Sequence, residues 1–238
     1  MLFVISSILM IMLPILLLIV VRRYTKLAWK AVALGAGMFL LAQIFKAVTG
    51  LPFLTVLRSG SWLAVLIGAL LPGVWEELTK YVPLRSAKLR SREAVISFGI
   101  GFGGVEAFYL GLQSLSLAIV NLSGQLPAGA VPDFVMAQLN APVGLGILLA
   151  AAALVERCMA IALHMTFVLI NARAVRTGKL SGLGLAMLLH TVVDMGAGYM
   201  QFRVTGIDSS MLVLEFFFLA IGAGCVWFIR RTVTGNEL

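Results

Sequence analysis

The chain has 238 residues, of which 61% are hydrophobic and only 12% are charged, and its mean hydropathy is +1.05. Soluble domains carry about 25% charged residues, so this composition excludes a soluble globular protein. The apolar residues form runs of about 20 without period-2 alternation, which predicts an all-α, polytopic membrane bundle and excludes an outer-membrane barrel. Cys158 and Cys225 both lie inside apolar runs, so neither a disulfide framework nor a zinc ribbon is expected.

Seven apolar runs predict about seven transmembrane helices in a single integral membrane domain, residues 1–238. No basic segment precedes the first run, and Arg22 and Arg23 follow it directly, so we interpret it as a true span and not as a cleavable signal peptide. The connection over residues 119–142 is interpreted either as a lid or partly re-entrant segment, or as an ordinary surface loop. The expected spans cover residues 2–21, 29–48, 62–84, 94–118, 143–171, 181–200 and 211–229.

The basic residues lie almost entirely on one side of the predicted helices. Thirteen of the eighteen Lys and Arg residues fall in the connections after the first, third and fifth spans and in the C-terminal segment, whereas Arg58 and Arg203 fall on the other side. The positive-inside rule then predicts an N-out, C-in orientation, which we expect in the bacterial cytoplasmic (plasma) membrane. The net charge of +8 is therefore assigned to topology and to the anionic lipid bilayer, and nucleic acid is not expected as a partner.

Nine ionisable residues lie within the third to sixth predicted spans. A charged side chain at mid-bilayer costs roughly 2.5–3.5 kcal/mol, so each indicates a function by default. Counted from the cytoplasmic ends, most lie at depths of roughly 10–20 Å and form one layer. Lys46 and Glu215 lie near the outer ends of their spans and are expected to reach the interface by snorkelling. The nine residues are Glu76, Glu77, Lys80, Glu106, Glu156, Arg157, His164, His190 and Asp194.

The spacing of these residues directs pairs of them to one helix face. Residues four apart share a face, as Glu76 and Lys80 do and as His190 and Asp194 do, whereas Glu77 points about 100° away from Glu76. Four carboxylates gathered in a low-dielectric site cannot all be ionised, so at least one is expected to keep a proton. Such a site can supply both an acid and a base.

The segment GIGFGGVE at residues 99–106 matches the dinucleotide-binding pattern GxGxxG in form only. No strand precedes it and it lies within a predicted membrane helix, so a nucleotide site is not expected. Gly99 and Gly103 have the GxxxG spacing, which predicts a smooth face for close helix approach.

Three short motifs occur in order on successive predicted helices. EELTK at 76–80 fits EExxK, FGGVE at 102–106 fits FxxxE, and HTVVD at 190–194 fits HxxxD. In this order they resemble the glutamate-dependent intramembrane protease superfamily, which includes the type II CAAX prenyl proteases, the ABI proteins and the PrsW proteases. The segment ERCMAIALH at 156–164 and the chain length make the chain most similar to the bacterial YhfC-type membrane peptidases. The resemblance covers about residues 62–200, the expected catalytic four-helix core.

The resemblance implies an intramembrane endopeptidase that uses activated water to hydrolyse peptide bonds of membrane proteins or lipid-anchored peptides. By motif position, Glu76 would be the general base, with Glu77 and Lys80 fixing it. His190 would hold the water or donate to the oxyanion. Substrate identity is not readable from the sequence.

Two positions depart from the CAAX enzymes. Glu106 stands where those enzymes carry a histidine, and Asp194 stands where they carry an asparagine. His164 lies at a similar depth and is a candidate for the missing imidazole. Arg157 and Glu156 are additional candidates for the site.

A metal-free mechanism and a metal-dependent one both remain open. Carboxylates and an imidazole can supply the base, the acid and the oxyanion donors that hydrolysis needs. HExxH is absent, and Lys80 and Arg157 already balance charge at this depth, so no cofactor is favoured. The alternative is Zn²⁺ held by Glu106, His190 and Asp194, with His164 as a further ligand.

Two functions of other classes are alternatives. An ion-coupled transporter also uses buried Asp, Glu and His residues, although no inverted repeat is found and only Pro72 and Pro83 suggest a broken helix. A non-catalytic membrane scaffold of the same fold is the other alternative.

Overall fold

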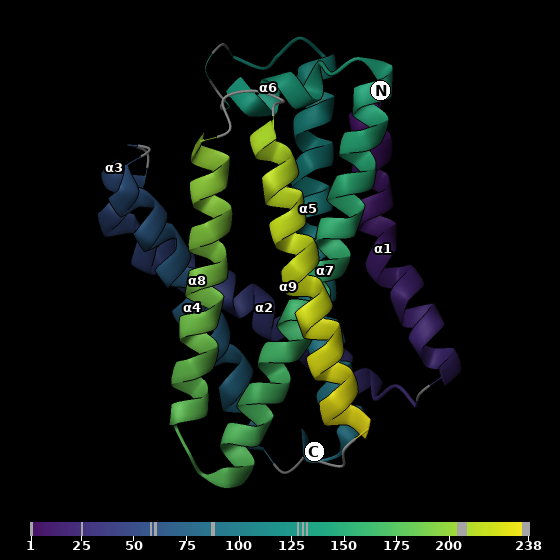
Figure 1. Ribbon diagram of the computed structural model, residues 1–238, viewed down its shortest axis with the longest axis vertical. Helices are drawn as coiled ribbons and strands as arrows, with labels where there is room; N and C mark the ends of the chain where they lie inside the picture. Colours follow the sequence, from purple (N-terminus) through teal and green to yellow (C-terminus); the bar gives the residue numbers. More distant parts are fainter. Residues whose placement is uncertain are drawn as a thin grey trace.

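The computed structural model describes residues 2–24, 26–57, 59, 61–86, 89–127, 129, 131, 133–203 and 209–234, and within these ranges the regular structure is helical (Figure 1). The long helices are α1 (Leu2–Tyr24), α2 (Trp29–Gly50), α4 (Trp62–Leu84), α5 (Arg92–Leu122), α7 (Val143–Thr177), α8 (Ser181–Arg203) and α9 (Ser209–Thr234). The short helical segments are η1 (Leu51–Phe53), α3 (Leu54–Leu57) and α6 (Asp133–Leu139). Every predicted span corresponds to one long helix, which confirms the polytopic helical bundle.

Five helical segments of the described chain are long and apolar enough to cross a membrane, namely residues 2–24, 29–57, 62–84, 92–122 and 143–177. The other two predicted spans correspond to α8 and α9, with 23 and 26 residues. The helices lie roughly along the long axis, and α6 lies at the end where α1 begins, opposite the end where α9 finishes (Figure 1). The N-out orientation itself stays a prediction.

Local signals explain where the helices that carry the site begin and end. The hydroxyl of Ser61 accepts a hydrogen bond from the backbone N–H of Ala64 at 3.2 Å, which caps α4. Ser91 caps α5 in the same way through the N–H of Ala94. α7 ends at Gly178, whose φ of +67° is the left-handed conformation that glycine adopts without strain. α4 continues through both Pro72 and Pro83, so the proline positions do not break it into separate helices.

Small residues allow the helices to approach closely, as the GxxxG spacing predicts. A Cβ atom at Gly99 would lie 3.3 Å from Cα of Met165, and one at Gly103 would lie 3.0 Å from Cα of Ile161, so this face of α5 lies against α7. On another face of α5, a Cβ atom at Gly101 would lie 2.8 Å from Cα of Val32 on α2. Because α5 contacts both α2 and α7 so closely, it forms the centre of the bundle.

The closest approach of α4 and α8 lies one turn before Glu76 and Glu77. A Cβ atom at Gly73 would overlap the hydroxyl of Thr191 and would lie 3.1 Å from the carbonyl oxygen of Met187. Thr191 directly follows His190 in the sequence. Gly73 therefore brings the acidic pair of α4 next to the histidine of α8.

Candidate active site

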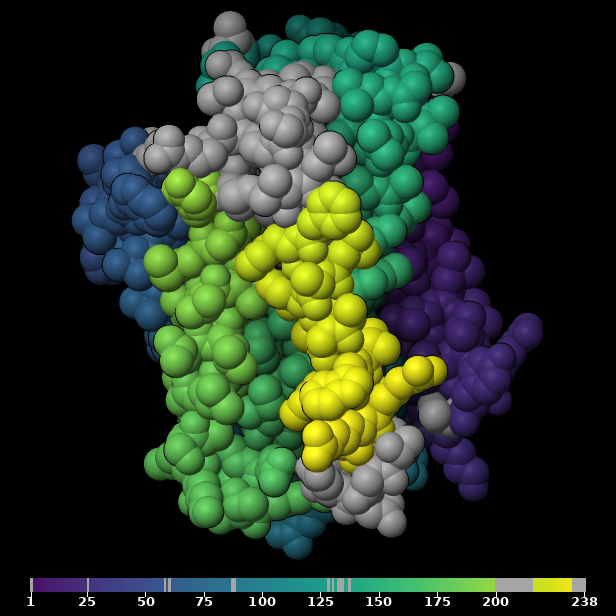
Figure 2. Space-filling model, viewed as in Figure 1, coloured from purple at the N-terminus to yellow at the C-terminus, as the bar shows by residue number. Residues whose placement is uncertain are grey.

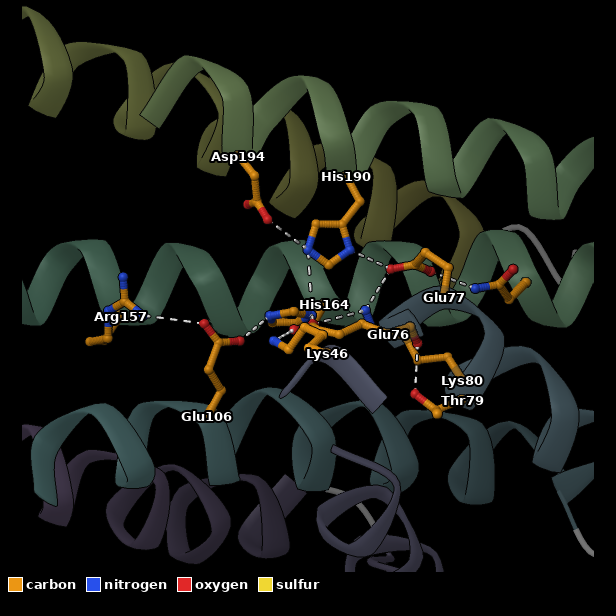
Figure 3. A network of polar contacts seen from close by, with 11 residues as sticks. Lys46, Glu76, Glu77, Thr79, Lys80, Glu106, Arg157, His164, His190 and Asp194 are labelled. Atoms are coloured by element: carbon orange, nitrogen blue, oxygen red, sulfur yellow. Dashed lines mark hydrogen bonds and ion pairs between the residues drawn. The ribbon is translucent and has the colours of Figure 1, made fainter. Parts of the chain in front are cut away.

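Five helices, α2, α4, α5, α7 and α8, direct polar side chains to one network inside the bundle (Figure 3). Glu77 and Lys80 have no exposed side-chain surface, and Glu76, His164 and His190 are each 3% exposed. Figure 3 draws the network of Lys46, Glu76, Glu77, Thr79, Lys80, Glu106, Arg157, His164, His190 and Asp194.

Glu77 is the buried anchor of the network. Its Oε1 atom lies 2.6 Å from the ammonium nitrogen of Lys80 and 2.7 Å from Nδ1 of His190. Its Oε2 atom accepts a hydrogen bond of 2.7 Å from the amide of Asn171 on α7. Lys80 also lies 4.5 Å from the ring centroid of Phe102, on α5. Glu77 thus joins three helices and holds the imidazole of His190 with Nδ1 toward the carboxylate.

Glu76 has one paired oxygen and one unpaired oxygen. Oε1 accepts a hydrogen bond of 2.6 Å from the ammonium of Lys46 on α2. Oε2 has no hydrogen-bond partner among the described residues, although it is buried. Around it lie Nδ1 of His164 at 3.8 Å and Nε2 of His190 at 3.9 Å. The ammonium nitrogen of Lys80 also lies 3.9 Å away.

The two histidines are arranged in the same way about this oxygen. His190 turns Nδ1 to the carboxylate of Glu77 and Nε2 to Glu76. His164 turns Nε2 to the carboxylate of Glu106 and Nδ1 to Glu76. Nδ1 of His164 is buried and has no hydrogen-bond partner among the described residues. Each imidazole therefore keeps one nitrogen fixed by a carboxylate and directs the other toward Glu76.

A second group of charges extends from His164 through Glu106 on α5 to Arg157 and Glu156, about two turns earlier on α7. Arg157 lies 3.4 Å from Oε1 of Glu106 and also pairs with the carboxylate of Glu156. Asp194 is the most exposed carboxylate of the network, at 32%, and its Oδ2 lies 3.5 Å from Nε2 of His190. The carboxylates of Asp194, Glu156 and Glu106 are thus partly exposed, whereas Glu76 and Glu77 are buried.

A cavity of about 250 Å³ adjoins these groups. Both partly exposed and buried side chains of the network border this cavity, so a peptide bond bound in it would contact both kinds. Its polar lining consists of Lys46, Glu76, Glu106, Glu156, Arg157, His164, His190 and Asp194. Such a cavity holds an acid–base pair, imidazoles and cations within one space, which is what hydrolysis of an amide requires.

A comparison with protein-family models matches residues 9–218 to a family described as YhfC intramembrane metalloprotease. The chain belongs to this family. The match covers most of the chain, and it agrees with the resemblance seen in the three ordered motifs. Comparisons with curated proteins and with solved structures gave no match. The YhfC family model describes an intramembrane protease, so this chain is a multi-pass membrane protein of that protease class.

The residues of this YhfC-family site fit a divalent cation. The ligand atoms of Glu76, Glu106 and His164 lie within 4.8 Å of one another. Each of these three residues has a buried atom without a hydrogen-bond partner among the described residues, namely Glu76 Oε2, Glu106 Oε2 and His164 Nδ1, and a bound cation would supply that partner. His190 adds a third suitable atom beside the same carboxylate oxygen. The site therefore offers carboxylate and imidazole atoms that are of the right type for a divalent cation and that are not already hydrogen-bonded.

All the site residues predicted from the sequence lie in this one network. The metal-ligand alternative stated from the sequence included Asp194 but not Glu76, whereas the close group consists of Glu76, Glu106 and His164. Lys80 pairs more closely with Glu77 than with Glu76, at 2.6 Å against 3.9 Å. Both glutamates lie about one turn before Lys80 on α4, so its flexible side chain can reach either of them. The packing of the surrounding helices places Glu77 nearer to it.

Two residues of the site were not predicted. Lys46 was expected to snorkel to the interface, and this was wrong, because its ammonium pairs with Glu76 and its side chain is only 20% exposed. Asn171, which bonds Glu77, was not singled out, although an amide deep in an apolar span was a usable signal. Lys46 also lies outside the expected core of residues 62–200. The side chain of Glu215 lies outside the described residues.

Proposed function

We propose that this protein is a metal-dependent intramembrane endopeptidase, with Glu76, His164 and His190 as the groups that hold a divalent cation. The observation that carries this proposal is the unpartnered Oε2 of Glu76, toward which both histidines direct a ring nitrogen. Two histidines and one glutamate are a ligand set of catalytic zinc sites, which leave one position open.

The carboxylates around the histidines support this ligand set. A metal-binding histidine typically donates its other ring N–H to a carboxylate, which fixes the ring and raises its basicity. Glu77 occupies that place for His190, and the carboxylate of Glu106 contacts Nε2 of His164, where it is placed to do the same. Glu77 is itself held by Lys80 and Asn171, so the orientation of His190 is doubly supported.

The remaining polar groups of the cavity would perform the proton transfers and stabilise the developing charge. When bound, a divalent cation would polarise the scissile carbonyl and activate the attacking water. Asp194 borders the cavity beside His190, so we assign to it the transfer of a proton from water to the leaving amine. Lys46 also borders the cavity, and its ammonium is placed to donate to the carbonyl oxygen as negative charge develops there.

A metal-free mechanism is the second candidate, and it is the one favoured from the sequence. Its support is the ammonium of Lys46, 2.6 Å from Glu76, together with Lys80 at 3.9 Å. The ammonium of Lys46 balances the charge of this carboxylate without a metal ion, and the ammonium of Lys80, which pairs with Glu77, lies nearby. In this mechanism Glu76 acts as the general base for water, and His190 holds the water.

We propose that the substrate approaches from the lipid side, between α8 and α9. A cleft of about 730 Å³ lies between α7, α8 and α9, and Figure 2 shows the hollow between the green α8 and the yellow α9. Leu163, Val193 and Ile221 line both this cleft and the site cavity. An apolar segment of a membrane protein or lipid-anchored peptide in the cleft would therefore lie against the site. The cytoplasmic membrane is the proposed location.

Proteolysis by the purified protein in liposomes tests the function. The wild-type protein is expected to cleave a membrane-anchored reporter, with bound metal near one equivalent per chain, and Glu76→Gln is expected to lose both. If metal-free protein still cleaves the reporter after exhaustive chelation, the metal-free mechanism is favoured. Ion-dependent solute flux without cleavage would favour a transporter, and neither activity would favour a scaffold.

A further inference from the structure

A second cavity, which we call the vestibule, lies on the other side of Glu156 from the site. It has a volume of about 390 Å³ and is bounded by α1, α5, α6 and α7. Leu139 and Val143 border it near the end of the bundle where α6 lies, and Glu156 borders it deep in α7 (Figure 1). From Val143 to Glu156 the helix rises about 20 Å, so the vestibule reaches well into the membrane-spanning part of the bundle.

Five polar residues, with hydroxyl, amide and carboxylate side chains, lie among the sixteen described residues that line the vestibule, and the other eleven are apolar or glycine. Ser6, Ser114 and Gln138 border it, and the side chains of these three residues form no hydrogen bond to another described residue. Polar groups enclosed in protein at membrane depth are satisfied by protein or by water. Several such groups around one roomy space provide the hydrogen-bond partners that a buried water needs.

Glu156 joins the vestibule to the site. It borders both cavities, and its carboxylate pairs with Arg157. Arg157 in turn pairs with Glu106, which contacts His164. A continuous set of charged groups therefore runs from the vestibule to the imidazole beside Glu76. The cleft toward α8 and α9, by contrast, meets the site through three apolar side chains.

We propose that the vestibule is the route by which water reaches the site, from the side of the membrane where α6 lies. This inference rests on the proposed function, because hydrolysis inside a bilayer consumes water, and the cleft meets the site only through the apolar side chains of Leu163, Val193 and Ile221. Glu156 and Arg157 form the polar junction through which water passes. Substrate and water thus reach the site from different faces of the bundle.

Small side chains on α7 keep the vestibule open. Gly146, Ala150 and Ala153 border it, whereas Ala151 lies between two of them in sequence and is exposed on the outer face of the same helix. Because residues 150 and 151 differ by about 100° around the helix, the same substitution at each position is a matched pair.

Thiol labelling tests the route without any need for proteolysis. In protein whose two native cysteines are replaced, Ala153→Cys and Ala151→Cys are exposed in liposomes to a charged, membrane-impermeant thiosulfonate reagent. We expect Ala153→Cys to react roughly tenfold or more faster, because the reactive thiolate forms in water and not in lipid. Adding Ala150→Leu should slow that reaction, and the reagent should work from the α6 side only.

Hydrolysis by the same variants completes the test. Ala150→Leu is expected to lower kcat for the reporter with KM unchanged, while Ala151→Leu should behave like wild type. Equal labelling at positions 151 and 153, or labelling of position 153 from the opposite side only, overturns the proposal. If labelling gives the expected result but neither the wild type nor any variant cleaves a reporter, the vestibule is confirmed as a water-filled cavity. The proposed protease activity is then wrong.

Discussion

Oε2 of Glu76 and Nδ1 of His164 lie 3.8 Å apart, both buried and neither with a hydrogen-bond partner among the described residues. Two buried, unpartnered polar atoms at this distance, with Nε2 of His190 3.9 Å from the same carboxylate oxygen, are placed to share one partner, a cation or a water. Both candidate mechanisms start from this arrangement, and they differ in what lies between these atoms.

Replacement of Glu76 by glutamine should remove activity while the fold persists, because glutamine keeps the shape and can still bond Lys46. Loss of an acid–base group costs about 10²–10⁴-fold in rate, and loss of a metal ligand costs at least as much. The measurement is reporter cleavage together with metal content by mass spectrometry. Glu93→Gln, on the exposed first turn of α5, is the control. Cleavage at the wild-type rate by Glu76→Gln would falsify the assignment.

Metal affinity should separate the residues that hold a cation from those that orient them. His164→Ala and His190→Ala should remove bound metal, whereas Glu106→Gln should weaken its affinity by about 10–100-fold. Competition with a chelator of known affinity gives the values. If Glu106→Gln removes the metal as completely as His164→Ala does, Glu106 is itself a ligand. If the active protein binds no metal at all, the metal-free mechanism replaces the present proposal.

Lys80→Met should destabilise the protein strongly. Glu77 has no exposed surface, and removing its ammonium partner leaves a buried charge, which costs about 3–5 kcal/mol of the free energy of unfolding. Unfolding in detergent micelles measures this loss. Lys30→Met, at an exposed position of α2, should have little effect. The double variant Lys80→Met with Glu77→Gln should recover part of the loss, and no recovery would show that charge is not its cause.

Gly73→Ala should separate α4 from α8 and disturb the site. The new methyl group would overlap the hydroxyl of Thr191, and overpacking of this kind costs about 1–3 kcal/mol. Activity should fall because the separation pulls Glu77 away from His190. Gly68→Ala, on the same helix but with only ordinary contact, is the control. Adding Thr191→Ala should restore part of the activity, and unchanged activity in Gly73→Ala alone would contradict the close approach.

Gly224→Leu should obstruct the cleft through which the substrate is proposed to enter. Gly224 borders the cleft, and a Cβ atom there meets nothing within 4 Å, so the side chain can fill the space without disturbing the backbone. KM should rise for a membrane-anchored reporter and stay constant for a short soluble peptide. Gly184→Leu is the control, because a Cβ atom at Gly184 also meets nothing within 4 Å but Gly184 does not border the cleft. Equal KM values for the two variants would remove the cleft from the mechanism.

The sequence alone determined the helical elements and which residues share one face of a helix. Long apolar runs must cross the bilayer as helices because backbone groups need partners there, and each run corresponds to one long helix. Helix periodicity likewise places His190 beside Asp194, and the structure shows them 3.5 Å apart. The layer of ionisable residues was also predictable, because depth follows from counting residues along a helix of constant rise.

Only the tertiary structure decided which side chains meet between helices. Lys46 reaches Glu76, and Asn171 reaches Glu77, because helix rotation and helix spacing bring their faces together. Glycines such as Gly73 set those spacings, through contacts between residues that are far apart in sequence. Periodicity within one helix carries no information about its rotation against a neighbour. For the same reason, the position of Glu156 between two cavities was visible only once α1, α5 and α7 were packed together.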